Sequence, residues 1–235
     1  MIFSLIRGQL DFQTALMEIL AVLVIIFLIL PFHEWAHAFT ASLLGDKSIK
    51  YRGRLSLNPL SHIDPMGALC LLLIGFGWAK PVPVDPRNFK NPKIGMAITA
   101  LAGPLANIIA AFVGCLILYG FIGFGGINLF FSDILGYILV FFSYYITCNI
   151  YLAVFNLIPV PPLDGSKILF AFLPDRIIYQ INRYQQYFTL IIFALLFLGT
   201  LSGPLEFLEN GLFDLLQNVS MGILSLFGAN FNILA

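Results

Sequence analysis

Long apolar runs alternate with short polar stretches along the chain, and the lengths of the apolar runs predict transmembrane helices. A helix needs roughly 20 predominantly apolar residues to cross a bilayer. The runs that approach or exceed this length are 14–44, 94–122, 131–158 and 187–201. A last stretch, 204–227, carries three acidic residues in its first half, so it is either a further span or an amphipathic helix in the membrane interface.

Between the first two runs the pattern changes. Residues 65–78 hold too few apolar residues for a comfortable span, which favours a re-entrant or interfacial segment. Residues 49–57 (IKYRGRLSL) alternate partly and contain a glycine, so they predict a small β-hairpin or an edge strand. Residues 80–84 (KPVPV) are a second candidate edge, and an ordinary interfacial loop is the alternative for both. An exposed edge could bind an extended peptide by strand addition.

The fold class that follows is an all-α polytopic membrane protein with about five or six transmembrane helices. No internal repeat or divider rich in Ser, Pro or charge interrupts the chain, so we expect a single domain over 1–235. Its core would be 14–165, and 204–235 would form the last transmembrane or interfacial helix. Residues 1–30 lack a small-x-small cleavage site after the apolar block, which predicts a retained helix rather than a signal peptide.

Composition supports a lipid environment. The chain is 60% hydrophobic and 10% charged, with a mean hydropathy of +0.94, whereas about a quarter of the residues in a soluble domain are charged. The net charge of zero argues against nucleic acid as a partner. The three cysteines all lie in apolar runs without CxxC spacing, so we expect small core residues rather than disulfides or metal ligands.

The positive charges predict an orientation. If 65–78 does not cross the membrane, then 45–93 and 165–186 lie on the same side. That side holds every Lys and Arg except Arg7, which is eleven of the twelve. The positive-inside rule makes this side cytoplasmic. The N-terminus and the 123–130 loop would then face outward.

Candidate chemistry lies in PFHEWAH, residues 31–37. His33 and His37 are four residues apart, so on a helix they share one face and can bind one tetrahedral Zn²⁺. Glu34 stands beside them and can act as a general base on water at the metal. The alternative is a pair of packed core histidines. The metal site is favoured because two of the three histidines in the chain have this spacing, in a membrane helix where ionisable groups are usually functional.

A catalytic zinc site of this kind needs a third protein ligand. The candidates near membrane depth are His62, Asp64, Asp133 and Asp164. Asp133 would lie on the opposite side of the membrane. Asp164 follows the fourth apolar run on the same side as the histidines, where the prolines of NLIPVPPLDG break the helix. Spatial reasoning therefore favours Asp164, although an ordinary Asp-Gly turn with Gly165 is the alternative.

Several of these stretches together resemble one protein family. HEWAH (33–37) and NLIPVPPLDG (156–165) resemble motifs of the site-2 protease family of intramembrane zinc metalloproteases, and AGPLAN (102–107) resembles its GPxxN segment. NPLSHIDPMG (58–67) and FGWAKPVPV (76–84) resemble its short bacterial members, and no PDZ or CBS domain is visible. The resemblance covers most of residues 25–170.

The resemblance implies one Zn²⁺ per chain, held by His33, His37 and Asp164, with Glu34 as the catalytic base. Asn156 would position the substrate or stabilise the oxyanion, and Asn107 would face the same cavity. Without the resemblance, interhelical hydrogen bonding would be the preferred interpretation of both amides.

Further expectations concern the substrate side. Asn58 and His62 are candidate substrate-binding residues, although His62 is alternatively a loop histidine or a partner of a ligand. Gly103 and Pro104 indicate close helix packing or a kink.

The function implied is regulated intramembrane proteolysis in a bacterial cell membrane, with transmembrane proteins as substrates and the lipid bilayer as partner. The rival functions are a membrane metal transporter and an inactive pseudoprotease that binds membrane proteins. The sequence leaves the oligomeric state open.

Overall fold

The computed structural model describes residues 12–74, 77–125 and 133–231, and this part of the chain is mostly helical without a sheet. Its one β-bridge joins Ile63 to Ala79. The longer elements in chain order are α2 (Phe12–Val24), the π-helical η1 (Ile25–Ile29), α3 (Leu30–Leu43), α5 (Pro65–Ile74), α6 (Pro92–Gly125), α7 (Asp133–Asn156), α9 (Asp175–Arg183), α10 (Gln185–Phe197) and α11 (Ser202–Leu226). The shorter ones are α4 (Ser48–Tyr51), η2 (Pro59–Ser61), η3 (Pro86–Asn88) and α8 (Asp164–Phe170).

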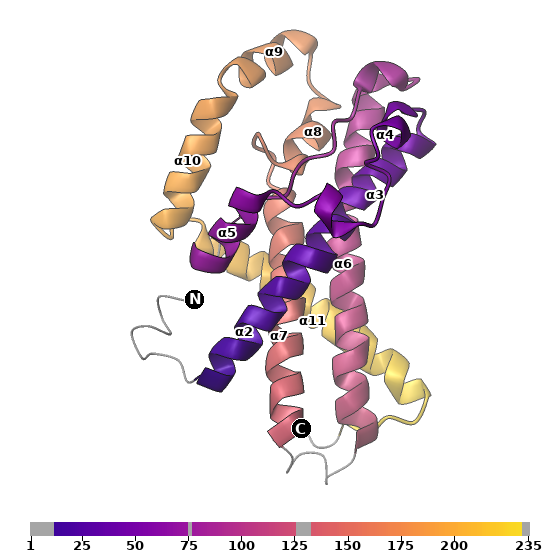
Figure 1. Ribbon diagram of the computed structural model, residues 1–235, viewed down its shortest axis with the longest axis vertical. Helices are drawn as coiled ribbons and strands as arrows, with labels where there is room; N and C mark the ends of the chain where they lie inside the picture. Colours follow the sequence, from indigo (N-terminus) through magenta and orange to yellow (C-terminus); the bar gives the residue numbers. More distant parts are fainter. Residues whose placement is uncertain (1–11, 75–76, 126–132, 232–235) are drawn as a thin grey trace.

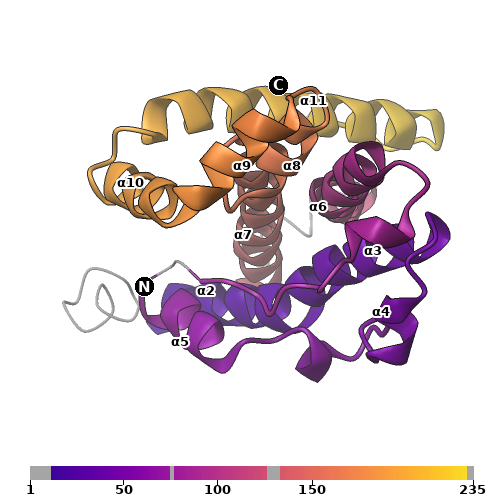
Figure 2. The ribbon, with the colours of Figure 1, turned by 90° about the horizontal axis from the view of Figure 1, so that it is seen from above.

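Helices α6 and α7 form the centre of the bundle. The continuous helix α2–η1–α3 packs against them on one side and α11 packs against them on the other (Figures 1 and 2). Within the described residues, three helical stretches are long and apolar enough to cross a membrane, namely Ile19–Leu43, Pro92–Phe124 and Gly136–Asn156. These correspond to the first three of the predicted long runs, and they make this a membrane protein.

The helix that carries HEWAH widens just before the motif. Pro31 has no amide hydrogen, and its ring would clash with the carbonyl four residues earlier in a regular α-helix. The π-turn at Ile25–Ile29 relieves this conflict, because the Leu30 amide donates to the Ile25 carbonyl five residues back. The helix therefore continues through Pro31 into α3 and brings the motif into the bundle.

The shorter apolar segments confirm only part of the prediction. Helix α5 has 10 residues, which agrees with the prediction that 65–78 is too short to span. Helix α10 has 13 residues, also short of a span, so the predicted crossing at 187–201 is not confirmed. Helix α11 runs obliquely across α6 and α7 (Figure 1). The predicted outward loop at 123–130 lies mostly outside the described residues.

The predicted β-hairpin at 49–57 is wrong. Residues Ser48–Tyr51 form the single helical turn α4, and the chain then reverses through Gly53, whose φ is +66°. The apparent alternation came from Ile49, which is fully buried against Ala38 and Ala41 of α3, beside the exposed Tyr51. Packing against a helix, rather than pairing with a strand, therefore sets the pattern of this segment.

A buried carboxylate organises the loops around α4. Asp46 is fully buried and accepts hydrogen bonds from the Ser48 amide and hydroxyl at 3.1 and 2.6 Å. It also accepts from the Asp85 amide and from the Asn88 side chain, both at 2.7 Å. Burial alone would raise the pKa of Asp46, but these hydrogen bonds outweigh it and lower the pKa. The carboxylate thereby ties residues 46–48 to residues 85–88.

We predict that Asp46→Asn destabilises the protein, because an amide nitrogen would replace an acceptor among these donors. Losing hydrogen bonds to a charged group costs about 2 kcal/mol, which corresponds to a fall of about 4–8 °C in the thermal midpoint. The measurement is thermal unfolding of the purified protein in detergent. Because folding lowers the pKa of Asp46, its contribution is complete above a pH of about 4 and is lost as the pH falls through the folded value. The difference between variant and wild type should shrink accordingly.

The matched control is Asp85→Asn in the same loop. The carboxylate of Asp85 pairs with the exposed Arg87 guanidinium, which lowers the pKa of Asp85 to about 2. Such a pair contributes little to stability, and Asn can replace Asp as the cap of η3. If Asp85→Asn lowered the midpoint as much as Asp46→Asn, the special role of Asp46 would be refuted.

Candidate metal centre

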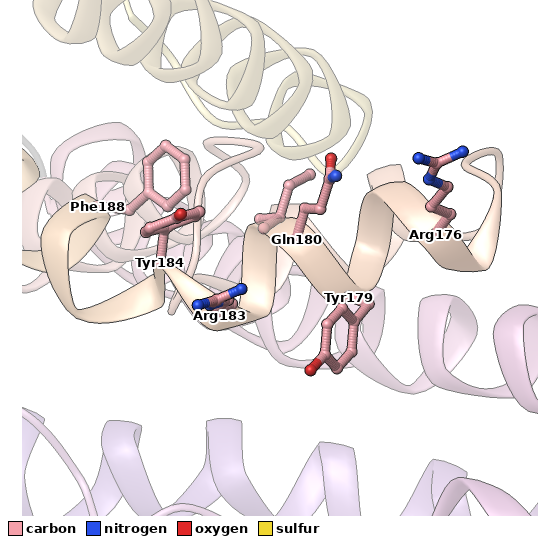
Figure 3. A pocket seen from close by; sticks show the side chains of 7 residues that line it. Arg176, Tyr179, Gln180, Arg183, Tyr184 and Phe188 are labelled. Atoms are coloured by element: carbon pink, nitrogen blue, oxygen red, sulfur yellow. The ribbon is translucent and has the colours of Figure 1, made fainter.

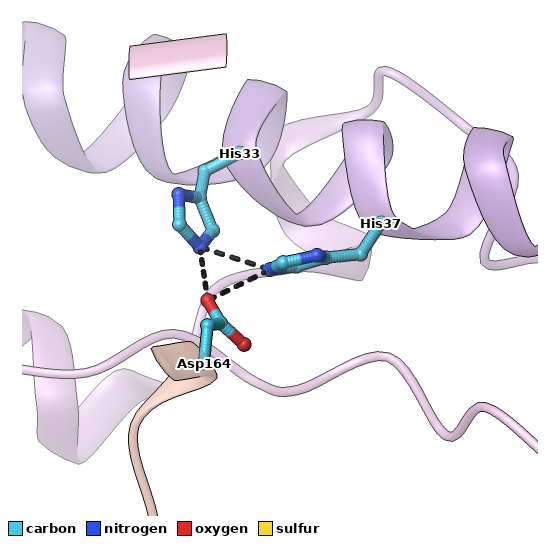
Figure 4. Close-up of side chains that lie close together, drawn as sticks. All are labelled: His33, His37 and Asp164. Carbon is cyan, nitrogen blue, oxygen red and sulfur yellow. Dashed lines mark hydrogen bonds and ion pairs between the residues drawn. The ribbon is translucent and has the colours of Figure 1, made fainter. Parts of the chain in front are cut away.

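Two histidines of α3 and the first residue of α8 meet in the interior of the protein. The Nε2 atoms of His33 and His37 are 3.0 Å apart, and Asp164 Oδ2 lies 3.3 Å from the first and 3.1 Å from the second (Figure 4). All three side chains are buried. The prediction that Asp164 lies beside the histidine pair, although about 130 residues away in sequence, is therefore confirmed.

These three atoms suit a tetrahedral zinc ion. Ligands at about 2.0–2.1 Å from Zn²⁺ lie roughly 3.3 Å from one another in a tetrahedron, which is close to the separations found here. They form the one group of at least three His, Cys, Asp or Glu with metal-binding spacing within the described part of the chain. Two imidazoles and a carboxylate leave the fourth position free for water or substrate, as a catalytic site requires.

The orientation of one imidazole is held from behind. Nδ1 of His37 lies 2.7 Å from the Thr99 carbonyl of α6, and we assign the proton to this nitrogen, so that it donates to the carbonyl. Nε2 of His37 is then left with its lone pair toward the site. A backbone acceptor behind a ligating histidine is a common feature of zinc sites.

Helix α6 approaches the site through a glycine. A Cβ atom at Gly103 would overlap His37 Nε2 and the ring of His33. No other residue type leaves room for the imidazoles at this helix–helix contact. The predicted close packing at AGPLAN is confirmed, and its purpose is space for the two rings.

Asp164 lies at the start of a helix rather than in a turn. Helix α7 ends at Asn156, and the chain passes through turns before α8 begins at Asp164. Asp164 and Gly165 both belong to the first turn of α8, so the alternative of an ordinary Asp-Gly turn is wrong. A Cβ at Gly165 would overlap the carbonyls of Leu157 and Ile158, which explains the glycine.

Two lysines hold the Asp164 carboxylate and the segment that follows α8. Lys167 Nζ lies 3.1 Å from Asp164 Oδ1, the oxygen that faces away from the histidines. Lys93, near the start of α6, donates to the Leu173 carbonyl and pairs with Asp175, each at 2.8 Å. Burial raises the pKa of Asp164, but as long as the imidazoles carry protons on Nε2, His37 and His33 together with Lys167 hold it well below its usual range. Asp164 is therefore an anionic donor.

Glu34 lies on α3 directly after the first histidine and is half-buried. Its Oε2 accepts a hydrogen bond of 3.0 Å from the amide of Val82. The side chain is thus held by the segment between α5 and α6. Its catalytic role remains a prediction.

The two asparagines have different surroundings. Asn107 is fully buried, and neither of its amide atoms has a hydrogen-bond partner within the described residues. Asn156 is half-buried and donates to the Leu152 carbonyl of its own helix at 2.9 Å. Within the described residues, neither side-chain amide therefore donates a hydrogen bond to another helix. Their assignment to substrate or oxyanion remains a prediction.

The other predicted residues have structural roles. Asp64 caps α5 through the amides of Met66 and Gly67 at 3.0 and 2.9 Å. His62 is fully buried with Nε2 2.7 Å from the Ser56 carbonyl, as expected for a loop histidine. Asn58 is exposed and caps η2.

None of these three belongs to the metal group, and Asp133 begins α7 at the opposite end of the bundle from α8 (Figure 1). Sequence reasoning gave no role to Thr99 or Lys93. Thr99 stands four residues before Gly103, so the helical spacing on α6 could have placed it at the same face.

An open concavity lies elsewhere, over α9 and the start of α10 (Figure 3). It is lined by Arg176, Tyr179, Gln180, Ile181, Arg183, Tyr184 and Phe188. None of these side chains is a carboxylate, imidazole or thiol, so this surface cannot supply the donor set of a zinc site.

Comparisons with known proteins agree with the geometry. The sequence profile of peptidase family M50 matches residues 132–199. Over 200 residues the chain is 38% identical to YwhC of Bacillus subtilis, which covers 85% of this chain and 87% of that protein. It is 30% identical to Rip2 of Mycolicibacterium smegmatis over 171 residues, covering 70% of this chain and 61% of that protein. Both relatives carry zinc-metalloprotease names. No solved structure matches the chain.

We predict that Gly103→Ala strips zinc from the purified protein. The added methyl group overlaps both imidazoles, so either α6 must move away or the rings must turn. The methyl group would lie against the ligating Nε2 atoms, so the loss of metal affinity should be at least the roughly 10–100-fold that follows from changes around a metal ligand. The measurement is zinc content after dialysis against a weak chelator.

Gly120→Ala is the matched control on the same helix, because a Cβ at Gly120 meets nothing within 4 Å. It should retain zinc as the wild type does. Equal zinc retention by the two alanine variants would show that α6 does not support the site through Gly103.

Proposed function

Because the chain belongs to peptidase family M50 and is a zinc metalloprotease of the site-2 protease type, we propose that it cleaves membrane-embedded or membrane-proximal segments of other membrane proteins. The observation that carries this proposal is the convergence of His33, His37 and Asp164, with Glu34 beside them. The proposed biological role is regulated intramembrane proteolysis, with transmembrane proteins as partners in the lipid bilayer.

In the mechanism we propose, His33, His37 and Asp164 hold the ion. Zinc, when bound, acts as a Lewis acid that polarises the scissile carbonyl and makes water more acidic. Glu34 takes a proton from the attacking water while the oxygen of that water bonds to the carbonyl carbon. Glu34 then gives this proton to the leaving nitrogen as the C–N bond breaks. Lys167 and the Thr99 carbonyl keep the Asp164 carboxylate and the His37 ring in place.

The asparagines and the extended segment supply the substrate side of the proposal. Asn107 has unused hydrogen-bonding capacity in the interior, which suits a group that meets the substrate rather than a structural contact. Asn156 is the second candidate for positioning or oxyanion stabilisation. Residues 80–84 remain the candidate edge for an unwound substrate, since the hairpin at 49–57 does not exist.

We also propose that the active site opens toward the cytoplasm of a bacterial cell. Elements α4, α8 and α9 gather at one end of the bundle (Figure 1), and the segments they belong to carry most of the Lys and Arg. The N-terminus would then face outward. A cytoplasmic site has a short path to water, which hydrolysis consumes.

The decisive variant is Glu34→Gln. Removing a general base typically costs about 10²–10⁴-fold in rate, whereas the three zinc ligands remain intact. Cleavage of a panel of labelled single-span helices in detergent should therefore fall at least 100-fold while zinc stays stoichiometric. Glu206→Gln, an exposed site on α11, is the control and should cleave as the wild type does.

The same variant separates the rival functions. If the protein is a metal transporter, the Glu34→Gln variant would still carry zinc into proteoliposomes, because its ligands are intact. If it is a pseudoprotease, the wild-type protein would cleave no helix of the panel. Full cleavage by Glu34→Gln would remove Glu34 from the mechanism.

A further inference from the structure

We propose that Arg54 is a positioning residue for this reaction. It fixes residues 80–82 so that the Val82 amide donates a hydrogen bond to Glu34, a contact that we call the cap. The cap lasts until a carbonyl of the substrate takes the place of Glu34 on that amide. The proposal rests on the proposed function, in which Glu34 is the base. It adds that the Glu34 oxygen bonded to Val82 becomes free only when a peptide is bound beside it.

The contacts of Arg54 are unusual for a cation. The residue is 7% exposed, and its guanidinium donates to the Ser61 carbonyl and, at 2.7 and 2.6 Å, to the carbonyls of Lys80 and Pro81. Each of these acceptors is a backbone oxygen. A buried charge is tolerated only when its hydrogen-bonding groups are satisfied. The three carbonyls are therefore held where the planar guanidinium can reach all of them.

The three hydrogen bonds of the Arg54 guanidinium, which we call the clamp, join two separate segments. Ser61 is the last residue of η2 and His62 follows it, whereas Lys80 and Pro81 come after α5. The Lys80 amide donates to the His62 carbonyl at 2.8 Å, which closes the connection from the other side. The backbone at residue 80 is thus bonded through both its amide and its carbonyl.

The next residues lie against α3. Val82 and Val84 pack with Leu55 and Phe89 onto the buried face formed by Ala38 and Ala41. The clamp therefore leads the chain directly onto the helix that carries Glu34. At this position the Val82 amide meets the Glu34 carboxylate at 3.0 Å.

Every amide hydrogen of residues 80–84 is already used. Lys80 donates to His62, Val82 donates to Glu34, and Val84 donates to the Val82 carbonyl at 3.0 Å. Pro81 and Pro83 have no amide hydrogen. An incoming peptide can gain a donor from this segment only by exchange. The bond from Val82 to Glu34 is the one that can be exchanged without breaking backbone pairing inside the loop.

This exchange links substrate capture to release of the base. When a substrate carbonyl accepts from the Val82 amide, Glu34 Oε2 loses its donor and is free to take a proton from water. A carboxylate is a stronger acceptor than a neutral carbonyl, so a single carbonyl does not displace it easily. A substrate that makes several contacts at once can do so, which favours extended, unwound segments over short peptides.

The test compares variants of full-length, zinc-loaded protein in detergent, with a quenched fluorescent single-span helix as the probe. In one variant an ester replaces the Val82 amide, so that the donor is lost while the side chain stays. Without the amide, Glu34 can still bond to water, whereas the substrate carbonyl has no other free donor in residues 80–84. The expected result is therefore a KM raised at least 10-fold, without a fall in kcat and with one zinc per chain. Lys50→Gln, at an exposed position on α4 outside this segment, is the control, with KM within about twofold of wild type. A wild-type KM in the ester variant would overturn the proposal.

Arg54 is tested in the same assay. Arg54→Ala should raise KM at least 10-fold with zinc retained, and added methylguanidinium should restore part of the loss. Arg54→Lys should fall between, because an ammonium cannot hold three carbonyls in the same plane. If Arg54→Ala does not fold, the ester variant still decides. An Arg54→Ala protein that folds, holds zinc and has an unchanged KM would contradict the positioning role.

The outcomes separate this inference from the proposed function. Full cleavage by Glu34→Gln would remove both Glu34 as the base and the contact between Val82 and Glu34 from the mechanism, whereas a wild-type protein that cleaves no helix of the panel would overturn the proposed function. Loss of cleavage in Glu34→Gln, combined with a wild-type KM in the ester variant, sinks only the cap.

Discussion

The close contact between α6 and α3 at Gly103 is the constraint on which the site depends. Metal ligands on one helix are useful only if the neighbouring helix leaves room for their rings while still excluding lipid. Gly103 supplies this room, and the Thr99 carbonyl one turn earlier holds His37 from behind. The same helix packs against α8 and bonds through Lys93 to the residues after α8, so that α6 positions both the histidines and the segment that carries Asp164.

The region between α3 and α6 is organised by two buried charges of opposite sign. Asp46 gathers amide and hydroxyl donors, and Arg54 gathers carbonyl acceptors. Together they hold the region between α3 and α6, which contains no strand within the described residues, in one arrangement against α3. In a small core with few polar groups, each such ion specifies backbone positions that apolar packing alone would leave degenerate. The contact between Val82 and Glu34 is a consequence of this arrangement.

The sequence could predict the features that depend on spacing within one segment. The length of the apolar runs identified the three long spans, and the interval between His33 and His37 placed both on one face. Asp164 could be placed because the charge pattern put its segment on the same side. The hairpin at 49–57 was wrong because alternation does not distinguish a strand from one helical turn packed on another helix. The roles of Asp46 and Arg54 depend on partners up to about 40 residues away, so no local sequence pattern predicts these roles.

Zinc K-edge X-ray absorption of the purified, active protein tests the central claim most directly. The account predicts one zinc per chain, with two imidazole nitrogens and oxygen ligands at about 2.0–2.1 Å and no sulfur. Replacing either histidine should reduce the imidazole signal. A sulfur shell near about 2.3 Å, which would bring one of the three cysteines to the metal, or an unaltered spectrum without His33 and His37, would contradict it.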